Sequence, residues 1–244
     1  MRIQFLGSGD AFGSGGRLQT CILLQAAAKT VLLDCGPSAL IAMRRFQVDP
    51  NSVSVVFLSH LHGDHFGGIP FFLLDAQLIS KRTEPLIIAG PPGTRQRLNA
   101  AMEVLFPGSS VSPKKFVMQI EELPLRQQCL IDGVKVAAFP VVHPSGDPAT
   151  ALRLEFGGKT VAYSGDTEWH DALLEAAVDA DLLIAEAYGF DRRIKYHLDA
   201  ATVAANAGRL QAKRIILTHL GPASLARLEE LPFAYAVDGL ELEI

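Results

Sequence analysis

Four side chains that can bind metal ions lie within six consecutive residues in the first third of the chain. The segment is His60-Leu61-His62-Gly63-Asp64-His65. It comes directly after residues 53–58 and Ser59. Residues 53–58 form a short β-branched run behind the turn signal Asp49-Pro50-Asn51, which predicts a buried strand. The four side chains are therefore expected on the loop that leaves the end of this strand.

The spacing within this segment divides the side chains into two sets. Imidazoles two residues apart on an extended segment point to the same side, so His60 and His62 can bind one metal ion together. Asp64 and His65, after a turn at Gly63, can bind a second ion. One ion would not use all of these side chains together with further ligands downstream, which favours a two-metal site with open positions. The alternative is a polar loop without chemistry, and the density of ligands argues against it.

Length and composition set limits on the class of protein. The chain has 244 residues, 49% of them hydrophobic, which favours one α/β domain over residues 1–244 with a sizeable core. The formal net charge of −4 argues against nucleic-acid partners in general, although it leaves a local basic patch open. A homodimer is an open alternative to a monomer.

Cysteine usage and hydrophobic runs indicate the compartment. Cys21, Cys35 and Cys129 are odd in number and widely spaced, without a CxxC motif, so a disulfide framework is not expected. The N-terminus enters a strand at once, and no apolar run of 18 residues occurs. These features predict a cytoplasmic protein without a membrane partner.

A glycine-rich loop over residues 7–16 follows the first predicted strand, residues 2–6. Its spacing is not GxGxxG, and a strand-like stretch over residues 20–25 stands where a phosphate-binding helix would start, which argues against dinucleotide binding. Another strand is expected over residues 30–34, so the chain opens with antiparallel strands.

The remaining elements alternate between strands and helices. Helices are predicted over residues 38–46, with Ser38 as the cap, and over residues 71–79, 94–105 and 200–210, the last capped by Asp199. Strands are predicted over residues 86–89, 116–120, 128–131, 134–139, 152–156, 160–163, 181–184 and 214–217, with a last strand over 234–244.

Four of these later strands each lead to a polar side chain. The side chains are His143, Asp166, Glu186 and His219. Positions just past the ends of strands are where sheet proteins gather their ligands, so we expect these groups to converge.

These motifs resemble those of the metallo-β-lactamase superfamily. The stretch "LSHLHGDHFGG" is similar to its HxHxDH motif and looks most like the branch of ribonuclease Z and related phosphodiesterases, and "VVHPSGD", "YSGDT" and "ILTHLGP" match its later motifs in order. The resemblance implies a four-layer αββα sandwich with a binuclear, usually zinc, centre at one edge. It also implies that the glycine-rich loop borders this site and that Asp34 supports the metal loop.

The resemblance, together with ligand chemistry, assigns seven metal ligands. His60, His62 and His143 would hold the first ion, Asp64, His65 and His219 the second, and Asp166 would bridge the two. Nitrogen and carboxylate ligands without thiolate suit zinc, with manganese or iron as alternatives. Aspartate stands where lactam-hydrolysing members typically have cysteine, which argues against antibiotic hydrolysis.

Three residues are candidates for a catalytic role. His197, in "KYHLDAAT", matches a histidine that in ribonuclease Z and related enzymes meets the scissile phosphate and protonates the leaving oxygen, although packing at a helix start would also explain it. Glu186, in "AEAY", resembles the acidic residue of that branch's histidine-glutamate-alanine motif, with Ala185 replacing the histidine. Asp64 completes the catalytic set. His170, beside Trp169, is interpreted as structural.

The sequence predicts a metal-dependent hydrolase. The favoured activity is that of a phosphodiesterase, which acts on a small phosphodiester through a metal-bridging hydroxide. The alternatives are a tRNA 3′-processing endoribonuclease of the ribonuclease Z type, a thioester or lactone hydrolase of the same fold, and a non-catalytic metal-binding protein. Ribonuclease Z enzymes grip tRNA with an arm inserted between the counterparts of His143 and Asp166. Only 22 residues separate these two here, and they predict a turn over residues 144–148 and one hairpin.

Overall fold

The computed structural model describes residues 1–146 and 148–244. Asp147, which belongs to the predicted turn over residues 144–148, lies outside the described residues. Within the described part of the chain, no helix is both long enough and apolar enough to cross a membrane.

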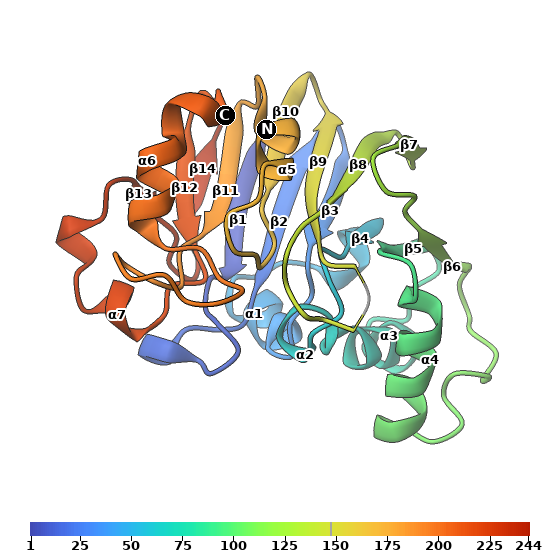
Figure 1. Ribbon diagram of the computed structural model, residues 1–244. Coiled ribbons are helices and arrows are strands. Elements are labelled where there is room, and N and C mark those ends of the chain that lie inside the picture. The colour runs from blue at the N-terminus through green and yellow to red at the C-terminus, as the bar shows by residue number, and fades with distance from the viewer. Residues whose placement is uncertain (147) are drawn as a thin grey trace.

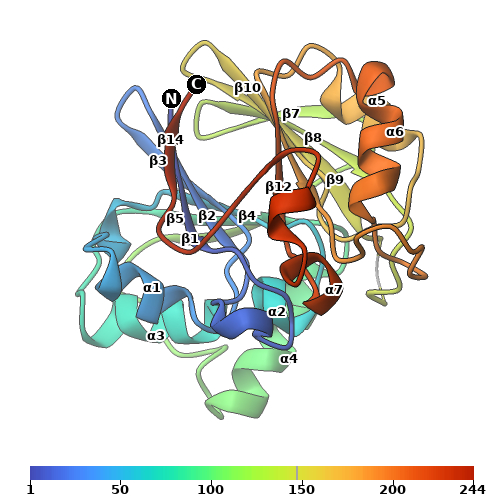
Figure 2. The ribbon, with the colours of Figure 1, turned by 90° about the vertical axis from the view of Figure 1, so that its left-hand side faces the viewer.

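Two seven-stranded sheets lie face to face in the described chain, and helices cover their outer faces (Figures 1 and 2). The first sheet has the order β14-β1-β2-β3-β4-β5-β6. Its strands are β1 (Arg2–Gly7), β2 (Cys21–Ala26), β3 (Lys29–Leu33), β4 (Val55–Phe57), β5 (Leu86–Gly90), β6 (Met118–Glu122) and β14 (Glu241–Glu243).

The second sheet repeats this layout with the second half of the chain. Its order is β13-β12-β11-β10-β9-β8-β7. Its strands are β7 (Gln128–Ile131), β8 (Val134–Pro140), β9 (Thr150–Phe156), β10 (Lys159–Tyr163), β11 (Leu182–Glu186), β12 (Ile215–Thr218) and β13 (Ala234–Tyr235). The predicted αββα sandwich is therefore confirmed.

The helices divide between the two outer faces (Figure 2). On the first sheet lie α1 (Ala39–Arg45), α2 (Gly63–Phe66), α3 (Ile69–Leu78) and α4 (Thr94–Leu105), and on the second α5 (Ala172–Ala177) and α6 (Ala200–Leu210). The short α7 (Pro222–Leu225) and the 3₁₀ turns at Ser14–Gly16, Pro50–Ser52 and Leu228–Glu230 complete the described elements.

Alternating side chains along the strands fill different cores. In β2, Ile22 and Leu24 join the core between the two sheets, whereas Leu23 packs into the layer beneath α1 and α3. In β10, Val161 faces the central core and Ala162 faces the layer beneath α5 and α6. Because these strands are buried on both faces, they read in the sequence as continuous apolar runs.

Parallel pairing brings several strand ends to one edge of the sandwich. Strands β3, β4 and β5 are parallel neighbours in the first sheet, and β10, β11 and β12 are parallel neighbours in the second. The carboxyl ends of parallel strands meet at the same edge, which is the lower edge in Figure 1, where α2 lies.

Several predicted elements differ from the structure in their bounds or caps. The predicted last strand is two strands in different sheets, because Asp238 accepts hydrogen bonds from the Ser8 and Leu18 amides and Gly239 turns the chain with φ 86°. Helix α3 begins at Ile69, before the predicted residue 71, because a proline is compatible with the first turn of a helix. The side chain of Ser38 does not cap α1 but accepts a hydrogen bond from the Gln19 amide at 2.9 Å.

Candidate metal centre

The seven predicted ligands lie together at this edge of the sandwich. The end of β4 supplies His60 and His62, and Asp64 and His65 follow in α2, so the predicted turn at Gly63 is the first residue of a short helix. The second sheet contributes one residue after each of β8, β10 and β12. The ligand atoms form two groups, each within 4.8 Å: His60, His62 and His143, and Asp64, His65, Asp166 and His219.

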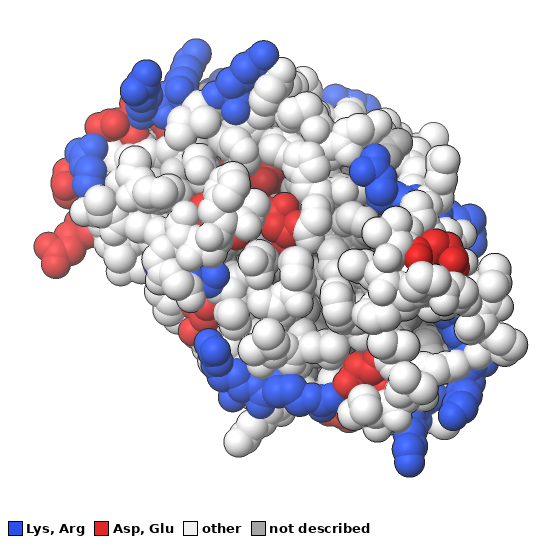
Figure 3. Space-filling model, turned by 90° about the horizontal axis from the view of Figure 1, so that it is seen from below, with Lys and Arg blue, Asp and Glu red and all other residues white. Residues whose placement is uncertain are grey.

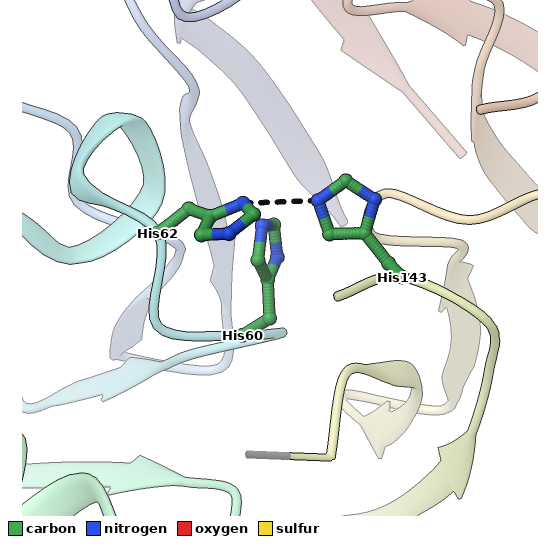
Figure 4. Close-up of side chains that lie close together, drawn as sticks. All are labelled: His60, His62 and His143. Atoms are coloured by element: carbon green, nitrogen blue, oxygen red, sulfur yellow. Dashed lines mark hydrogen bonds between the residues drawn. The ribbon is translucent and has the colours of Figure 1, made fainter. Parts of the chain in front are cut away.

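The first group consists of three imidazoles that face one another (Figure 4). His62 donates from Nε2 to the carbonyl oxygen of Pro144 at 3.1 Å, and His143 donates from Nδ1 to that of Tyr196 at 2.9 Å. These carbonyls fix which nitrogen carries the single proton of a neutral ring. In that form His62 Nδ1 and His143 Nε2 would present two lone pairs to each other at 2.9 Å. Two acceptors at this distance require a proton or a cation.

His60 completes this group. Its Nδ1 lies 3.1 Å from the Ser59 hydroxyl, and its Nε2 is buried without a hydrogen-bond partner in the described chain. A buried polar atom without a partner costs free energy, so a ligand at Nε2 would account for it. The group therefore fits a cation.

The second group combines two imidazoles with two carboxylates. His65 donates from Nδ1 to Asp34 at 2.7 Å, while its Nε2 lies 3.2 Å from Asp64 and 3.3 Å from Asp166 without a hydrogen bond. His219 has the same arrangement, with Nδ1 at 3.3 Å from the Thr20 hydroxyl and Nε2 at 3.3 Å from Asp166. In both groups one ring nitrogen is oriented by the protein and the other faces the cluster, as in metal-binding histidines.

Asp166 lies between the two groups. Its Oδ2 is 3.3 Å from Nε2 of His219 and 4.0 Å from Nε2 of His143. Its Oδ1 is buried and has no hydrogen-bond partner among the described residues. This is the place that a bridging carboxylate would occupy.

The surroundings of the cluster side chains favour the protonation states that bind metal ions. Burial lowers the pKa of His60 well below its usual value and also lowers the pKa of His143 and of His219, so these rings stay neutral. Burial raises the pKa of Asp166, but the neighbouring imidazoles His219 and His65 outweigh it and bring the pKa well below its usual value.

His65 is the exception in the cluster. Burial lowers its pKa, but the carboxylates of Asp166, Asp64 and Asp34 reverse this and raise the pKa well above its usual value. Three carboxylates around one imidazole make a site that attracts positive charge. A divalent ion would take the place of the proton at Nε2.

Asp34 holds the ligand segment in place. This buried carboxylate accepts from the Ser59 amide at 2.8 Å, from the Ser59 hydroxyl at 2.8 Å and from the Tyr163 hydroxyl at 2.9 Å, besides His65. Its backbone is left-handed, with φ 58°. Sequence reasoning found Asp34 but missed the hydrogen bonds that Ser59 and Tyr163 make to it, although both residues lie within the quoted motifs.

His197 and Glu186 form a pair beside the cluster. His197 donates from Nδ1 to Glu186 at 2.9 Å, and the Thr167 amide donates to the other oxygen of this carboxylate. Burial and the nearby Asp166 raise the pKa of Glu186 to about 8. Burial lowers the pKa of His197, but Glu186 outweighs it, so the net shift is upward. The ring of His197 is 22% exposed, so it can meet a substrate.

Two further aromatic or imidazole groups lie near this pair. Tyr188, which sequence reasoning missed, places its ring centroid 4.9 Å from that of His197. The ring packs against the backbone of Gly221, where an added Cβ would come within 2.9 Å of it. His170 accepts from the Ala172 amide at 3.1 Å at the start of α5, and its structural role stays a prediction.

Comparison with known proteins identifies the family. A family model described as "Beta-lactamase superfamily domain" matches residues 29–220. The chain belongs to the metallo-β-lactamase superfamily. A ribonuclease Z of Methanosarcina acetivorans is 30% identical to this superfamily member over 267 residues, which cover 90% of the chain and 87% of the relative. A ribonuclease Z of Mycobacterium bovis is 27% identical, with 91% and 87% covered.

Solved structures of the superfamily agree with this fold. Human tRNase Z, short form, has a TM-score of 0.80 and 27% identity, with 100% of this chain and 99% of that chain covered. A diphosphatase from the PhnP family has a TM-score of 0.79 at 20% identity, with 100% and 97% covered, a likeness of fold alone. This superfamily member is a metal-dependent hydrolase whose curated relatives are named ribonuclease Z, and its fold implies divalent metal ions.

Proposed function

We propose that this hydrolase is a two-metal phosphodiesterase for a small phosphodiester. The observation that carries the proposal is the set of five cluster histidines, each with one ring nitrogen oriented by Ser59, Asp34, Thr20 or a backbone carbonyl and the other facing the cluster. His60, His62 and His143 would bind one ion, Asp64, His65 and His219 the other, and Asp166 would bridge them.

Zinc suits this donor set, since all seven side chains offer imidazole nitrogen or carboxylate oxygen, and manganese or iron are the alternatives. Two bound cations lower the pKa of a water toward about 7 and hold phosphate oxygens for in-line attack. The carboxylate of Asp64 lies 11% exposed at this site, where it can also orient the attacking water.

His197 is the proposed proton donor. Glu186 fixes its Nδ1, and its Nε2 makes no hydrogen bond to any described residue, so that nitrogen can donate to the oxygen that leaves phosphorus. His197 also lies with His143 and Asp166 in a third possible metal-binding group, but the seven proposed ligands can hold both ions without it, which argues against a non-catalytic metal-binding protein. A thioester needs less help from a proton donor, because a thiolate is a better leaving group than an alkoxide.

The connection between His143 and Asp166 supports a small substrate. Its described helices and strands are β9 and β10, joined by the two-residue turn of Gly157 and Gly158, and its other described residues, 144–146, 148–149 and 164–165, are short links at the two ends. Both glycines have positive φ, 58° and 71°, as the tight turn of a hairpin requires. Lys and Arg side chains lie mostly toward the edges of the face at the strand ends (Figure 3), whereas backbone binding of nucleic acid needs several positive contacts together.

A tRNA 3′-processing endoribonuclease is the second candidate, and the relatives named ribonuclease Z favour it. The alignment with the Methanosarcina acetivorans relative spans 267 positions but covers 90% of this 244-residue chain. That relative therefore carries residues within the matched region that have no counterpart here. Their absence is what a chain without a tRNA-binding arm would show.

A substrate panel tests the proposal. The metal-loaded protein is assayed on bis(p-nitrophenyl) phosphate, a thioester, a lactone and a precursor tRNA. We expect turnover of the diester to exceed that of the other three. Accurate 3′ trimming of precursor tRNA faster than diester cleavage makes the second candidate correct, and turnover of the thioester or lactone alone overturns both.

A further inference from the structure

A cavity outside the metal cluster has His197 in its wall. It has a volume of about 220 Å³ and lies between the connection that follows β10 and the start of α6. Its walls include Glu168, Trp169, Arg193, Lys195, His197 and Thr202. It shares His197 with the site described above, so a group bound in it would sit next to the proposed proton donor.

The walls combine an aromatic surface with positive charge. Trp169 is half-buried, and the guanidinium of Arg209 lies 5.7 Å from its ring centroid. Arg193 is exposed and forms no hydrogen bond or ion pair with any described residue. Lys195 contacts the ring of Tyr196, with Nζ 4.5 Å from the centroid. An indole beside cationic side chains is the combination that proteins use to bind bases and phosphates of nucleotides.

The two carboxylates in the walls are already engaged by the backbone. Glu168 accepts from the Tyr196 amide at 3.2 Å. Asp199 caps α6, accepting from the Thr202 amide at 2.7 Å and from the Thr202 hydroxyl at 2.8 Å. This cap occupies the positive end of the helix, so a bound anion would depend on Arg193 and Lys195 rather than on the helix.

We propose that this cavity is the leaving-group subsite and binds a nucleotide portion of the substrate, with the base against Trp169 and a phosphate at Arg193 and Lys195. The inference rests on the proposed phosphodiesterase function. Complete ligand pockets usually span about 300–1,000 Å³, so a cavity of this size suits one part of a substrate.

The position of the subsite agrees with the reaction. Water loses a proton to the solvent and its oxygen forms a bond to phosphorus, the bond from phosphorus to the leaving oxygen breaks, and that oxygen receives a proton from His197, which regains one from the solvent. The products are a phosphomonoester at the metal cluster and an alcohol in the cavity. The alcohol carries the base and its own phosphate, so the substrate is a diester between a phosphate and a nucleotide hydroxyl.

Binding to the cavity can be measured without turnover, because Trp169 is the only tryptophan of the chain. The metal-loaded protein is titrated with adenosine 5′-monophosphate, adenosine and ribose 5-phosphate while its fluorescence is recorded. We expect saturable quenching by the monophosphate and at least tenfold weaker binding of the other two. Equal binding of ribose 5-phosphate excludes a role for the base, and no saturable quenching by any of them overturns the inference.

Neighbouring arginines provide a matched pair of variants. Arg193 lines the cavity, whereas Arg192 is equally exposed and does not. Arg193→Gln should weaken monophosphate binding by roughly tenfold, the loss of one charge-assisted contact, and raise KM for a dinucleoside phosphate that bears a terminal phosphate on its leaving side. The ratio of kcat/KM for this dinucleoside phosphate to that for bis(p-nitrophenyl) phosphate should fall by a similar factor, and Arg192→Gln should change neither this ratio nor monophosphate binding.

The outcomes separate the two proposals. Equal effects of both substitutions, or an equal loss on both substrates, overturn the subsite. Monophosphate binding that depends on Arg193, in a protein that cleaves no phosphodiester, supports a nucleotide site and overturns the phosphodiesterase function instead.

Discussion

The two halves of the molecule build the metal cluster in different ways. The first half supplies four candidate ligands from one six-residue segment, which Asp34 and Ser59 support through hydrogen bonds at the Ser59 amide, His60 and His65. The second half supplies His143, Asp166 and His219 from three separate loops, each positioned by the pairing of a different strand. The first set is fixed by local geometry, and the second depends on the assembled sheet.

This difference predicts where the site is sensitive. A substitution that distorts one loop of the second half should displace one ligand. A substitution of Asp34 should displace the whole ligand segment of the first half. Asp166 is the exception, because it contacts imidazoles from both halves, at 3.3 Å from His65 and 3.3 Å from His219. Substitutions can therefore rank the two halves by their effects on metal binding, chemistry and folding.

The largest effect is expected for Asp166→Ala. Wild-type protein should carry close to two transition-metal ions per chain, and this variant should lose both, because it lacks the carboxylate between the two groups. Turnover should fall by at least about 10⁴-fold, since the two ions act as a unit. Elemental analysis and diester hydrolysis measure both changes.

Glu243→Ala is the control for this experiment. The Glu243 carboxylate is 76% exposed, and it lies near the C-terminus, at the edge opposite to the cluster in Figure 1. It should retain wild-type metal content and turnover. Full metal and full activity in Asp166→Ala would show that the ligand assignment is wrong.

His197→Ala should separate chemistry from metal binding within the second half. The variant should keep both metals and lose about 10²–10⁴-fold of phosphodiester turnover, the usual contribution of a general acid. The loss should shrink for diesters with good leaving groups, because these need no proton. Turnover across a series of aryl and alkyl diesters, beside elemental analysis, measures it.

A second histidine serves as the matched control. His170→Ala removes an imidazole that only accepts from the Ala172 amide, so turnover should not change. Equal losses on good and poor leaving groups in His197→Ala would exclude a role as proton donor.

Asp34→Asn tests the common support of the first half. Asparagine, like aspartate, tolerates the left-handed backbone conformation at φ 58°. Its neutral amide lacks the negative charge that orients His65. Metal affinity should fall by about 10–100-fold, as for other groups that orient metal-binding histidines. Competition with a chelator of known affinity measures the change.

Tyr163→Phe provides a milder comparison at the same carboxylate. It removes only the hydroxyl donor to Asp34 at 2.9 Å, so it should weaken metal binding less than Asp34→Asn. Unchanged affinity in Asp34→Asn would show that the four ligands of the first half do not depend on this support.

The same difference explains what the sequence could predict. The segment over residues 60–65 is contiguous, so its spacing alone indicated a metal site, and His143, Asp166 and His219 were found through the motifs around them. The bond from Tyr163 to Asp34 was not predictable, because it joins residues 129 positions apart across the two sheets. The division of residues 234–244 between two sheets was missed for a similar reason, since it depends on the contact of Asp238 with the Ser8 and Leu18 amides.

The smallest effect is expected for Asp199→Ala, which tests whether α6 matters to the site only through folding. Asp199 was predicted as the cap of α6 from its residue type, and its carboxylate accepts from the Thr202 amide at 2.7 Å. Loss of such a cap costs about 0.5–2 kcal/mol of the free energy of unfolding, or roughly 2–4 °C in Tm per kcal/mol for a chain of this size. Thermal unfolding measures the change, and elemental analysis should find wild-type metal content, because no candidate ligand lies on α6.

Asp199→Asn keeps an oxygen acceptor, so its free energy of unfolding should stay within a few tenths of a kcal/mol of that of the wild type. Loss of metal in Asp199→Ala would mean that the start of α6, through the Tyr196 carbonyl that orients His143, controls the cluster as strongly as Asp34 does in the first half.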